Sequence, residues 1–225
     1  MEIEIVYSFQ NANKAKGLAV IIDVFRAFST ACFVINNGAK MIISVDDIEL
    51  AYNLKKENPD YILMGERHDI VPDGFDFGNS PAEIENVDFC GKTVIHTTSA
   101  GSQGIARAIN AKEIITGSFV NAQAVINYVK SSKHQIISLV CTDAAEPKNE
   151  DIICAEYIES HLEGNPLDFS DIKTHLTNHP CALRFLNNTP ALRKKDFDLC
   201  LSLDKFNFNL KAEMQKNHLI YLKKV

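Results

Sequence analysis

Side chains that could do chemistry follow apolar stretches of this 225-residue chain. Asp23 and Arg26 come just after the run 18–22, Glu66 follows the run 61–64, and Asp151 follows the run 135–140. Carboxylates of this kind can hold Mg²⁺ or carry protons, and a guanidinium can bind an oxyanion. Because ligands of open α/β sheets bind outside the carboxyl ends of the strands, we expect these side chains to share one site.

The segment 97–103 is rich in hydroxyl groups and leads into a helix-like stretch. It contains Thr97, Thr98, Ser99, Gly101 and Ser102. Backbone N–H groups at a helix N-terminus favour an anion, and Thr and Ser hydroxyls add donors. The alternative is a helix N-cap with a tight glycine turn that needs no ligand. Beside the other polar loops, we favour the interpretation as an anion site.

The loop 65–80 is long for a connection between two elements. It spans about sixteen residues, whereas about four to six are usual, and loops of such length are commonly functional or disordered. Its aliphatic and aromatic side chains favour an ordered loop. The polar residues that it offers to a substrate are Arg67, Asn79 and Ser80.

Four carboxylates are candidate metal ligands, namely Asp23, Glu66, Asp76 and Asp151. Mg²⁺ commonly takes one or two protein carboxylates plus waters and substrate oxygens. Asp151 has a structural alternative, because an acid in the first turn of a helix suits the helix dipole. Asp23 ends a wholly apolar run and has the weakest structural explanation, although an Asp23–Arg26 ion pair is a structural alternative for Arg26.

Histidine and cysteine spacings do not indicate a zinc site or a disulfide framework. His175 and His179 are four positions apart, but Pro180 follows at once and no third ligand stands nearby. His96 could move protons beside the 97–103 segment, and a structural role is the expected one. The six cysteines form no CxxC pair, so we expect a reducing cytoplasm.

Apolar strand-like runs alternate with helix-like segments. The predicted strands are 2–7, 18–23, 41–45, 61–64, 93–96, 113–116 and 135–140. The predicted helices between them include a buried one at 26–35, one at 48–56 and one at 121–130. Such alternation predicts an α/β fold, in which helices cover both faces of a mostly parallel or mixed central sheet.

The pattern weakens after about residue 165. Helices are predicted at 168–178 and 190–200, and a final strand is predicted at 218–222. With no internal repeat and no low-complexity linker, we expect a single domain over 1–225 with a less regular C-terminal part.

Composition is ordinary for a globular enzyme, with 46% hydrophobic and 23% charged residues. The net charge of −6 and pI near 5.6 argue against a nucleic-acid surface. No apolar run approaches the roughly eighteen residues of a membrane span, and no signal peptide is visible. We expect a small anionic substrate, no nucleic-acid or membrane partner and, from base rates alone, a homodimer.

Several familiar catalytic motifs are absent from the sequence. It has no Walker loop, no GxGxxG turn and no GxSxG elbow, and no cysteine is followed six positions later by arginine. Phe25 stands two positions after Asp23, which is unlike the paired aspartates of haloacid-dehalogenase phosphatases.

Five short motifs resemble, in their order, those of the 2-phosphosulfolactate phosphatase family (ComB-like). They are IDVFRA at 22–27, GER at 65–67, GFDFGNSP at 74–81, TTSAG at 97–101 and ED at 150–151. The match covers about residues 1–160 well. The resemblance implies the family's three-layer α/β/α fold and Mg²⁺-dependent hydrolysis of (2R)-2-phospho-3-sulfolactate to sulfolactate and phosphate. That step belongs to coenzyme M biosynthesis in methanogens, but members also occur elsewhere, so the pathway does not follow.

Two positions depart from the family pattern. Phe25 stands where the family usually has Leu, which is a change between apolar residues. His68 and Asp69 follow Arg67 where a glycine pair is common. The second departure lies in the functional loop, where it could alter the choice of substrate.

With this reaction, we expect Asp23, Glu66 and Asp151 to hold Mg²⁺, and Arg26 with the amides of 97–102 to bind phosphate. A metal-activated water would attack phosphorus, and a covalent aspartyl-phosphate on Asp23 is the rival mechanism. Asp23, Arg26 and Glu66 are the predicted catalytic residues.

Further anion sites could bind the carboxylate and sulfonate of such a substrate. Arg67, Arg107 and the Asn79–Ser80 pair can supply them. Two alternatives stay open: a phosphatase for another small phosphorylated hydroxy acid, and a non-catalytic anion-binding protein of the same fold.

Overall fold

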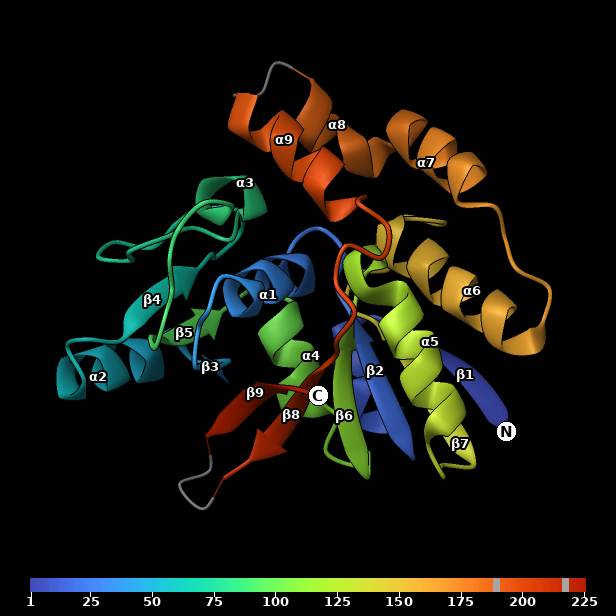
Figure 1. The fold of residues 1–225 in the computed structure, drawn as a ribbon, viewed down its shortest axis with the longest axis horizontal. Coiled ribbons are helices and arrows are strands. Elements are labelled where there is room, and N and C mark those ends of the chain that lie inside the picture. The colour runs from blue at the N-terminus through green and yellow to red at the C-terminus, as the bar shows by residue number, and fades with distance from the viewer. Residues whose placement is uncertain (188–190, 216–218) are drawn as a thin grey trace.

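The computed structural model describes residues 1–187, 191–215 and 219–225 (Figure 1). The strands are β1 (Glu2–Tyr7), β2 (Leu18–Ile22), β3 (Met41–Ser44), β4 (Ile62–Gly65), β5 (Thr93–Thr97), β6 (Glu113–Gly117), β7 (Ile136–Cys141), β8 (Leu210–Met214) and β9 (Ile220–Lys224). The α-helices are α1 (Ala27–Asn36), α2 (Ile48–Glu57), α3 (Pro81–Ile84), α4 (Gly101–Arg107), α5 (Ala122–Ser131), α6 (Glu150–Glu163), α7 (Phe169–Asn178), α8 (Pro180–Leu186) and α9 (Ala191–Cys200). Two 3₁₀ helices are η1 (Phe9–Lys14) and η2 (Phe119–Asn121).

The described strands form one mixed sheet in the order β1-β7-β2-β6-β8-β9-β3-β5-β4. Strands β1, β7, β2 and β6 form one parallel group, and β3, β5 and β4 form another. The antiparallel strands β8 and β9 join the two groups. The C-terminal part of the chain therefore completes the middle of the sheet.

The twist of the sheet brings the two parallel groups to a common site. Three successive antiparallel pairings separate the two groups, so the strands of one group point in the direction opposite to those of the other. Neighbouring strands twist by roughly 20–25°, so a rotation of more than about 100° accumulates between β2 and β5. Figure 1 shows β4 and β5 lying at a large angle to β2 and β6. Loops that follow strands of both groups can therefore meet.

The two faces of β2 explain why its sequence is apolar throughout. Leu18, Val20 and Ile22 belong to a core cluster with residues of α5 and α6. Ala19 and Ile21 belong to the cluster that contains residues of α1 and α4. Because helices cover both faces, a strand in this position buries every side chain. The arrangement confirms the predicted three-layer α/β/α fold.

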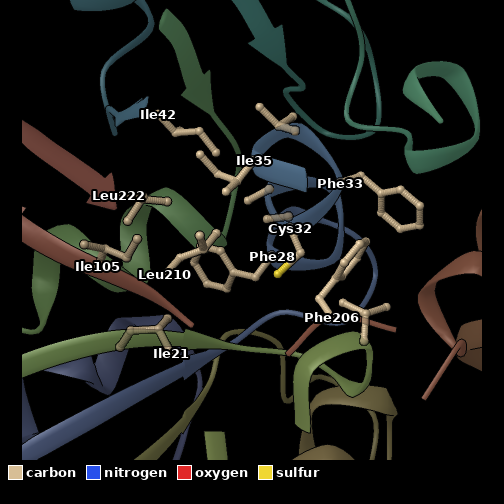
Figure 2. Close-up of a cluster of buried hydrophobic side chains, with 14 of the residues drawn as sticks. Ile21, Phe28, Cys32, Phe33, Ile35, Ile42, Ile105, Phe206, Leu210 and Leu222 are labelled. Atoms are coloured by element: carbon tan, nitrogen blue, oxygen red, sulfur yellow. The ribbon is translucent and has the colours of Figure 1, made fainter. Parts of the chain in front are cut away.

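Helix α1 is a core element. All residues from 27 to 35 are buried, as its apolar sequence predicted. Figure 2 shows Phe28, Cys32 and Ile35 of α1 among side chains from β2, β3, α4, β8 and β9. Since α1 begins just after Arg26, this packing fixes the loop that carries the first candidate catalytic residues.

Most predicted elements differ from the observed ones by one or two residues at their ends. Pro190 and His218, at the starts of the last predicted helix and strand, lie outside the described residues.

The sequence analysis missed α8 and β8. Strand β8 (LKAEM) is half polar and mostly only partly buried. Helix α8 begins at Pro180, directly after α7, so the sequence does not separate the two helices clearly. None of the described helices has the length and apolar character needed to span a membrane.

Candidate active site

Loops that follow β2, β4, β5 and β7 line one cavity, together with the start of α6 and with α8. The cavity has a volume of about 210 Å³. Its charged lining residues are Asp23, Glu66, Asp69, Asp143, Glu150, Asp151, Arg26 and Arg184. The other lining residues are Phe9, Phe25, His68, Asn79, Thr98, Ser99, Ala100 and Thr142. The chain thus brings together the polar loops that the sequence predicted would share a site.

Asp23 and Asp151 are buried side chains that meet at one hydroxyl group. Oγ1 of Thr142 lies 3.1 Å from Oδ2 of Asp23 and 3.0 Å from Oδ2 of Asp151. A hydroxyl has a single proton, so it donates to only one carboxylate at a time. The other oxygens accept backbone N–H groups, Asp23 Oδ1 from Ala27 and Asp151 Oδ1 from Val24, both at 2.8 Å.

Burial raises the pKa of both carboxyl groups. The pKa of Asp23 rises to about 6, because burial outweighs the hydrogen bonds from Ala27 and Thr142 that lower it. Burial, and then the charge of Asp23, raise the pKa of Asp151 well above its usual value. A cation placed between these groups would favour their ionised forms.

Glu150 adds a third buried carboxylate at the first residue of α6. Its side chain is only 3% exposed, and its Oε1 lies 3.4 Å from Nη2 of Arg184. Burial raises the pKa of Glu150, while the charge of Arg184 lowers it. Oε2 has no hydrogen-bond partner among the described residues. Most buried polar atoms have a hydrogen-bond partner. The thiol of Cys181, whose hydrogen bond lowers the pKa of Glu150, is one candidate donor, and a bound cation is another candidate partner.

Glu66 connects two of the cavity loops. Its Oε1 accepts the N–H of Ser99 at 2.7 Å, and its Oε2 accepts the Ser99 hydroxyl at 3.0 Å and the N–H of Asp69 at 2.9 Å. Both oxygens therefore already have protein donors. In this structure Glu66 holds the turn at 66–70 against the 97–101 loop, and its role as a metal ligand stays a prediction.

Arg26 is buried and pairs with two carboxylates from distant parts of the chain. Its Nη1 lies 2.9 Å from Asp196 Oδ2, and its Nη2 lies 3.0 Å from Asp69 Oδ1. In the described part of the chain these pairs replace the Asp23–Arg26 ion pair that was the structural alternative. Asp196 also accepts the Ser80 hydroxyl at 2.7 Å. Ser80 therefore helps to position the carboxylate that pairs with Arg26.

Arg184 is a cavity residue that the sequence analysis missed. Its Nη2 donates to the carbonyl oxygen of Phe25 at 2.9 Å, and its Nη1 lies 3.8 Å from Asp69 Oδ2. Burial lowers the pKa of Arg184, but the charges of Glu150 and Asp69 outweigh burial and raise it. Arg184 lies in α8, where no motif marks it. Thr142 and Asp143 were likewise not assigned a role, whereas Asp69 was noted only as a departure that could alter the choice of substrate.

Several predicted binding residues lie behind the cavity lining. Arg67 donates to the carbonyl oxygens of Glu66 at 2.8 Å and Asp46 at 3.2 Å, and to the Thr97 hydroxyl. Ser80 caps α3 by accepting the N–H of Glu83 at 3.2 Å. These contacts occupy Arg67, Thr97 and Ser80 within the protein, so their substrate-binding roles stay predictions.

Two further candidates from the sequence are corrected by their positions. Asp76 accepts the N–H of Leu63 at 2.8 Å and pairs with Lys55 at 3.2 Å, outside the cavity lining. The guanidinium of Arg107 lies 5.8 Å from the centre of the Phe9 ring, and Arg107 does not line the cavity. Asp76 was a candidate because it lies in the loop 65–80, and Arg107 because of its charge.

The amides of the 97–102 segment are largely used by the loop itself. Thr98 N–H donates to Ser102 Oγ and Ser102 N–H to Thr98 Oγ1, both at 3.1 Å. Ser99 N–H donates to Glu66. These bonds lie within the loop, while Ala100, the N-cap residue of α4, makes no side-chain capping bond. Thr98 and Ser99 nonetheless line the cavity, so the anion-binding role of the segment stays a prediction.

Two glycines permit the close contacts of the site. A Cβ at Gly101 would lie 2.7 Å from Cβ of Ala27 and 3.0 Å from Asp23 Oδ2. A Cβ at Gly65 would lie 1.9 Å from the carbonyl oxygen of Thr97, and Gly65 has φ 146°. Only glycine fits where β4 ends against β5.

His96 lies behind Asn79 rather than in the cavity lining. Its Nε2 is 3.2 Å from Asn79 Oδ1, and burial lowers the pKa of His96 to about 4. A neutral, buried imidazole of this kind positions Asn79, which does line the cavity. The geometry favours the structural role for His96.

The charges of the cavity suit a bound cation. No three or more His, Cys, Asp or Glu side chains of the described residues are grouped so as to hold a metal ion. Mg²⁺ does not require such a group, because it commonly takes one or two protein carboxylates. Acidic residues outnumber arginines in the lining, and Glu150 Oε2 lacks a partner. This hard-oxygen donor set fits Mg²⁺.

Comparison with known proteins identifies the class and the family. A family model described as 2-phosphosulpholactate phosphatase matches residues 4–213. A protein of Caldicellulosiruptor saccharolyticus named "Probable 2-phosphosulfolactate phosphatase" is 38% identical over 185 residues, covering 80% of this chain and 76% of that protein. Proteins with the same name from Thermoplasma acidophilum (33% over 190 residues; 84% and 82% covered) and Clostridium tetani (32% over 212 residues; 91% of each) are also similar.

These matches place the chain among the phosphoric monoester hydrolases. It belongs to the 2-phosphosulpholactate phosphatase family.

Proposed function

We propose that this enzyme hydrolyses the phosphate monoester of (2R)-2-phospho-3-sulfolactate, giving 3-sulfolactate and phosphate. The choice of substrate rests on the family match over residues 4–213. The observation that supports the chemistry is the pair of buried carboxylates, Asp23 and Asp151, at the hydroxyl of Thr142. Phosphoryl transfer depends mainly on positioning and electrostatic stabilisation, which this pair and the nearby arginines can provide.

Mg²⁺ is the proposed cofactor. Asp23 and Asp151 would hold it, and Glu150 would contribute its charge and its unpartnered oxygen. When bound, Mg²⁺ would polarise a phosphoryl oxygen and offset the negative charge of the lining carboxylates. Glu66 is a less direct candidate, because both of its oxygens accept protein N–H or O–H groups.

The side chains of the cavity would divide the remaining tasks. Arg26 and Arg184 would bind phosphoryl oxygens through their planar guanidinium groups. Burial raises the pKa of Asp23 to about 6, and a bound cation would favour its ionised form, so that Asp23 could hold the cation and orient the attacking water.

In this reaction the water oxygen bonds to phosphorus while the bond from phosphorus to the ester oxygen breaks, and that oxygen takes up a proton. The rival mechanism forms an aspartyl-phosphate on Asp23, which water then hydrolyses.

Phosphate release tests the proposed reaction. The enzyme would be incubated with racemic 2-phosphosulfolactate, phospholactate or para-nitrophenyl phosphate, with Mg²⁺ and then with excess EDTA. We expect Mg²⁺-dependent release from the sulfonated substrate. Release from the other esters only would indicate that the substrate is another small phosphorylated hydroxy acid. No release from any ester would contradict the proposed hydrolysis and favour a non-catalytic anion-binding role.

We also propose a cytoplasmic location and a homodimer. All six cysteines are free, which is usual in a reducing compartment. The homodimer rests on the frequency of two-fold assemblies among enzymes. Sedimentation equilibrium at several protein concentrations would test it, and a monomer at all of them would contradict it.

A further inference from the structure

The turn at 67–70 carries the acidic side chain of Asp69, although the backbone conformation of the turn does not depend on an acidic residue there. Arg67 and Ile70 exchange two backbone hydrogen bonds of 2.9 and 3.0 Å. Between them, His68 and Asp69 have φ values of 53° and 63°. Two left-handed residues in such a position are typical of a two-residue type I′ turn, where Gly, Asn and Asp are favoured. Glycine or asparagine would therefore fit position 69 without strain.

The carboxylate of Asp69 lies among three guanidinium groups. Its Oδ1 is 3.0 Å from Nη2 of Arg26. Its Oδ2 is 3.8 Å from Nη1 of Arg184 and 3.8 Å from Nη1 of Arg193. These arginines come from the start of α1, from α8 and from α9. A planar carboxylate among guanidinium groups takes the same position that an anionic group of a ligand would take.

The backbone of the turn is anchored, whereas the side chain of Asp69 is partly accessible. Asp69 N–H donates to Glu66 Oε2 at 2.9 Å, and His68 N–H donates to Ser99 Oγ at 2.9 Å. The Asp69 side chain is 37% exposed. A ligand can therefore displace the carboxylate by rotating one side chain, but each binding event has to break its contacts with the arginines.

We propose that Asp69 competes with the phosphoryl group of the substrate for the guanidinium groups of Arg26, Arg184 and Arg193. The inference rests on the proposed function only in requiring an anionic phosphate ester as substrate. It assigns to Asp69 the effect of lowering the affinity of the wild-type enzyme for phosphate and for phosphate esters. A neutral residue at position 69 would free the guanidinium groups and raise that affinity.

Binding of inorganic phosphate tests the competition directly. Titration calorimetry would compare the wild type with Asp69→Asn and Asp69→Gly, in the presence of Mg²⁺. We expect both variants to bind phosphate about tenfold more tightly, because the arginines lose their internal carboxylate partner. Arg193→Gln in the Asp69→Gly background should reverse part of the gain. Asp73→Asn is the matched control, since it removes an exposed acid from the same loop and should leave the affinity unchanged.

Unchanged or weaker phosphate binding in both folded variants would overturn the inference. So would variants that merely unfold at lower temperature without any gain in affinity, because that result would give Asp69 a structural role only. Circular dichroism would establish that the variants are folded.

Turnover separates this inference from the proposed function. The KM for phosphosulfolactate and the KM for phospholactate should both fall in Asp69→Gly, and unchanged values of both would contradict the competition. If no variant hydrolyses phosphosulfolactate and the phosphate affinity still rises, the proposed substrate fails while the competition stands. If wild-type turnover is observed and the phosphate affinity does not rise, the competition fails alone.

Discussion

Asp23 and Asp151 approach the same hydroxyl group, that of Thr142, at 3.1 and 3.0 Å. Since one hydroxyl cannot donate to both, the protonation of one carboxyl group affects the other. Both side chains are buried and have a raised pKa. Buried acids with perturbed pKa values in a cavity are typical of functional sites.

The stability of the protein should depend on the ionisation of Asp23. Its pKa rises from 3.8 in the unfolded chain to about 6 in the folded protein. The folded state therefore binds the proton more tightly. The stabilisation from this group is fully present below about pH 4 and is lost as the pH rises through about 6.

Asp23→Asn removes this titration. Without added metal, we expect the variant to gain about 1–3 kcal/mol relative to wild type between pH 4 and pH 7. Urea unfolding of both proteins at the two pH values would measure the change. An identical pH dependence in the two proteins would be inconsistent with a raised pKa at this site.

Gly101→Ala should disturb the site by steric contact. The new Cβ would lie 2.7 Å from Cβ of Ala27 and 3.0 Å from Asp23 Oδ2. We expect a loss of about 1–3 kcal/mol in unfolding free energy, together with a lower kcat for phosphate release. Gly91→Ala is a suitable control, because a Cβ there meets no atom within 4 Å although its φ of 71° adds strain. A variant with normal kcat would show that Asp23 tolerates the displacement.

Glu66→Gln tests whether Glu66 positions the loops that carry Ser99 and Asp69 or binds the metal ion. Glutamine has one acceptor oxygen and an NH₂ group, so it cannot accept the N–H groups of both Ser99 and Asp69. We expect a loss of about 1–2 kcal/mol in stability and a higher KM, with the Mg²⁺ concentration for half-maximal activity unchanged. A large rise in that Mg²⁺ concentration would instead make Glu66 a metal ligand.

Arg184→Lys should weaken substrate binding. A lysine cannot reproduce the planar group that contacts both Phe25 and Glu150. We expect the KM for the phosphate ester to rise about tenfold, as expected for the loss of one charge-assisted contact. Arg107→Lys, outside the cavity lining, serves as the control. If only the control variant changed the KM, Arg107 rather than Arg184 would be the substrate-binding arginine.

The sequence predicted the sheet well where burial on both faces makes a strand continuously apolar, as in β2. It failed for β8, because the alternating LKAEM pattern is short and half polar. The central position of β8 and β9 in the sheet could not be inferred, since it depends on pairing with β6 and β3. Local patterns carry no information on such long-range contacts.

For the site, the sequence identified side chains next to strand ends, which place Asp23, Glu66 and Ser99 at the cavity. It could not predict which way a side chain points. Arg67 turns toward Asp46 and Thr97, and Arg184 comes from a helix that no motif marks. Asp196, the buried partner of Arg26, is 170 positions away from it. Such pairs become visible only when the chain has folded.

Phosphate release by Asp23→Asn and Asp151→Asn tests the central claim most directly. Each variant would be assayed with 2-phosphosulfolactate and Mg²⁺, beside Asp171→Asn, which removes an exposed acid from α7. Loss of a positioned acid–base or metal-binding carboxylate should lower kcat by roughly 10²–10⁴-fold in the two cavity variants and leave the α7 variant unchanged. Full turnover by a folded Asp23→Asn or Asp151→Asn enzyme would contradict the assignment of this carboxylate pair as the reaction centre.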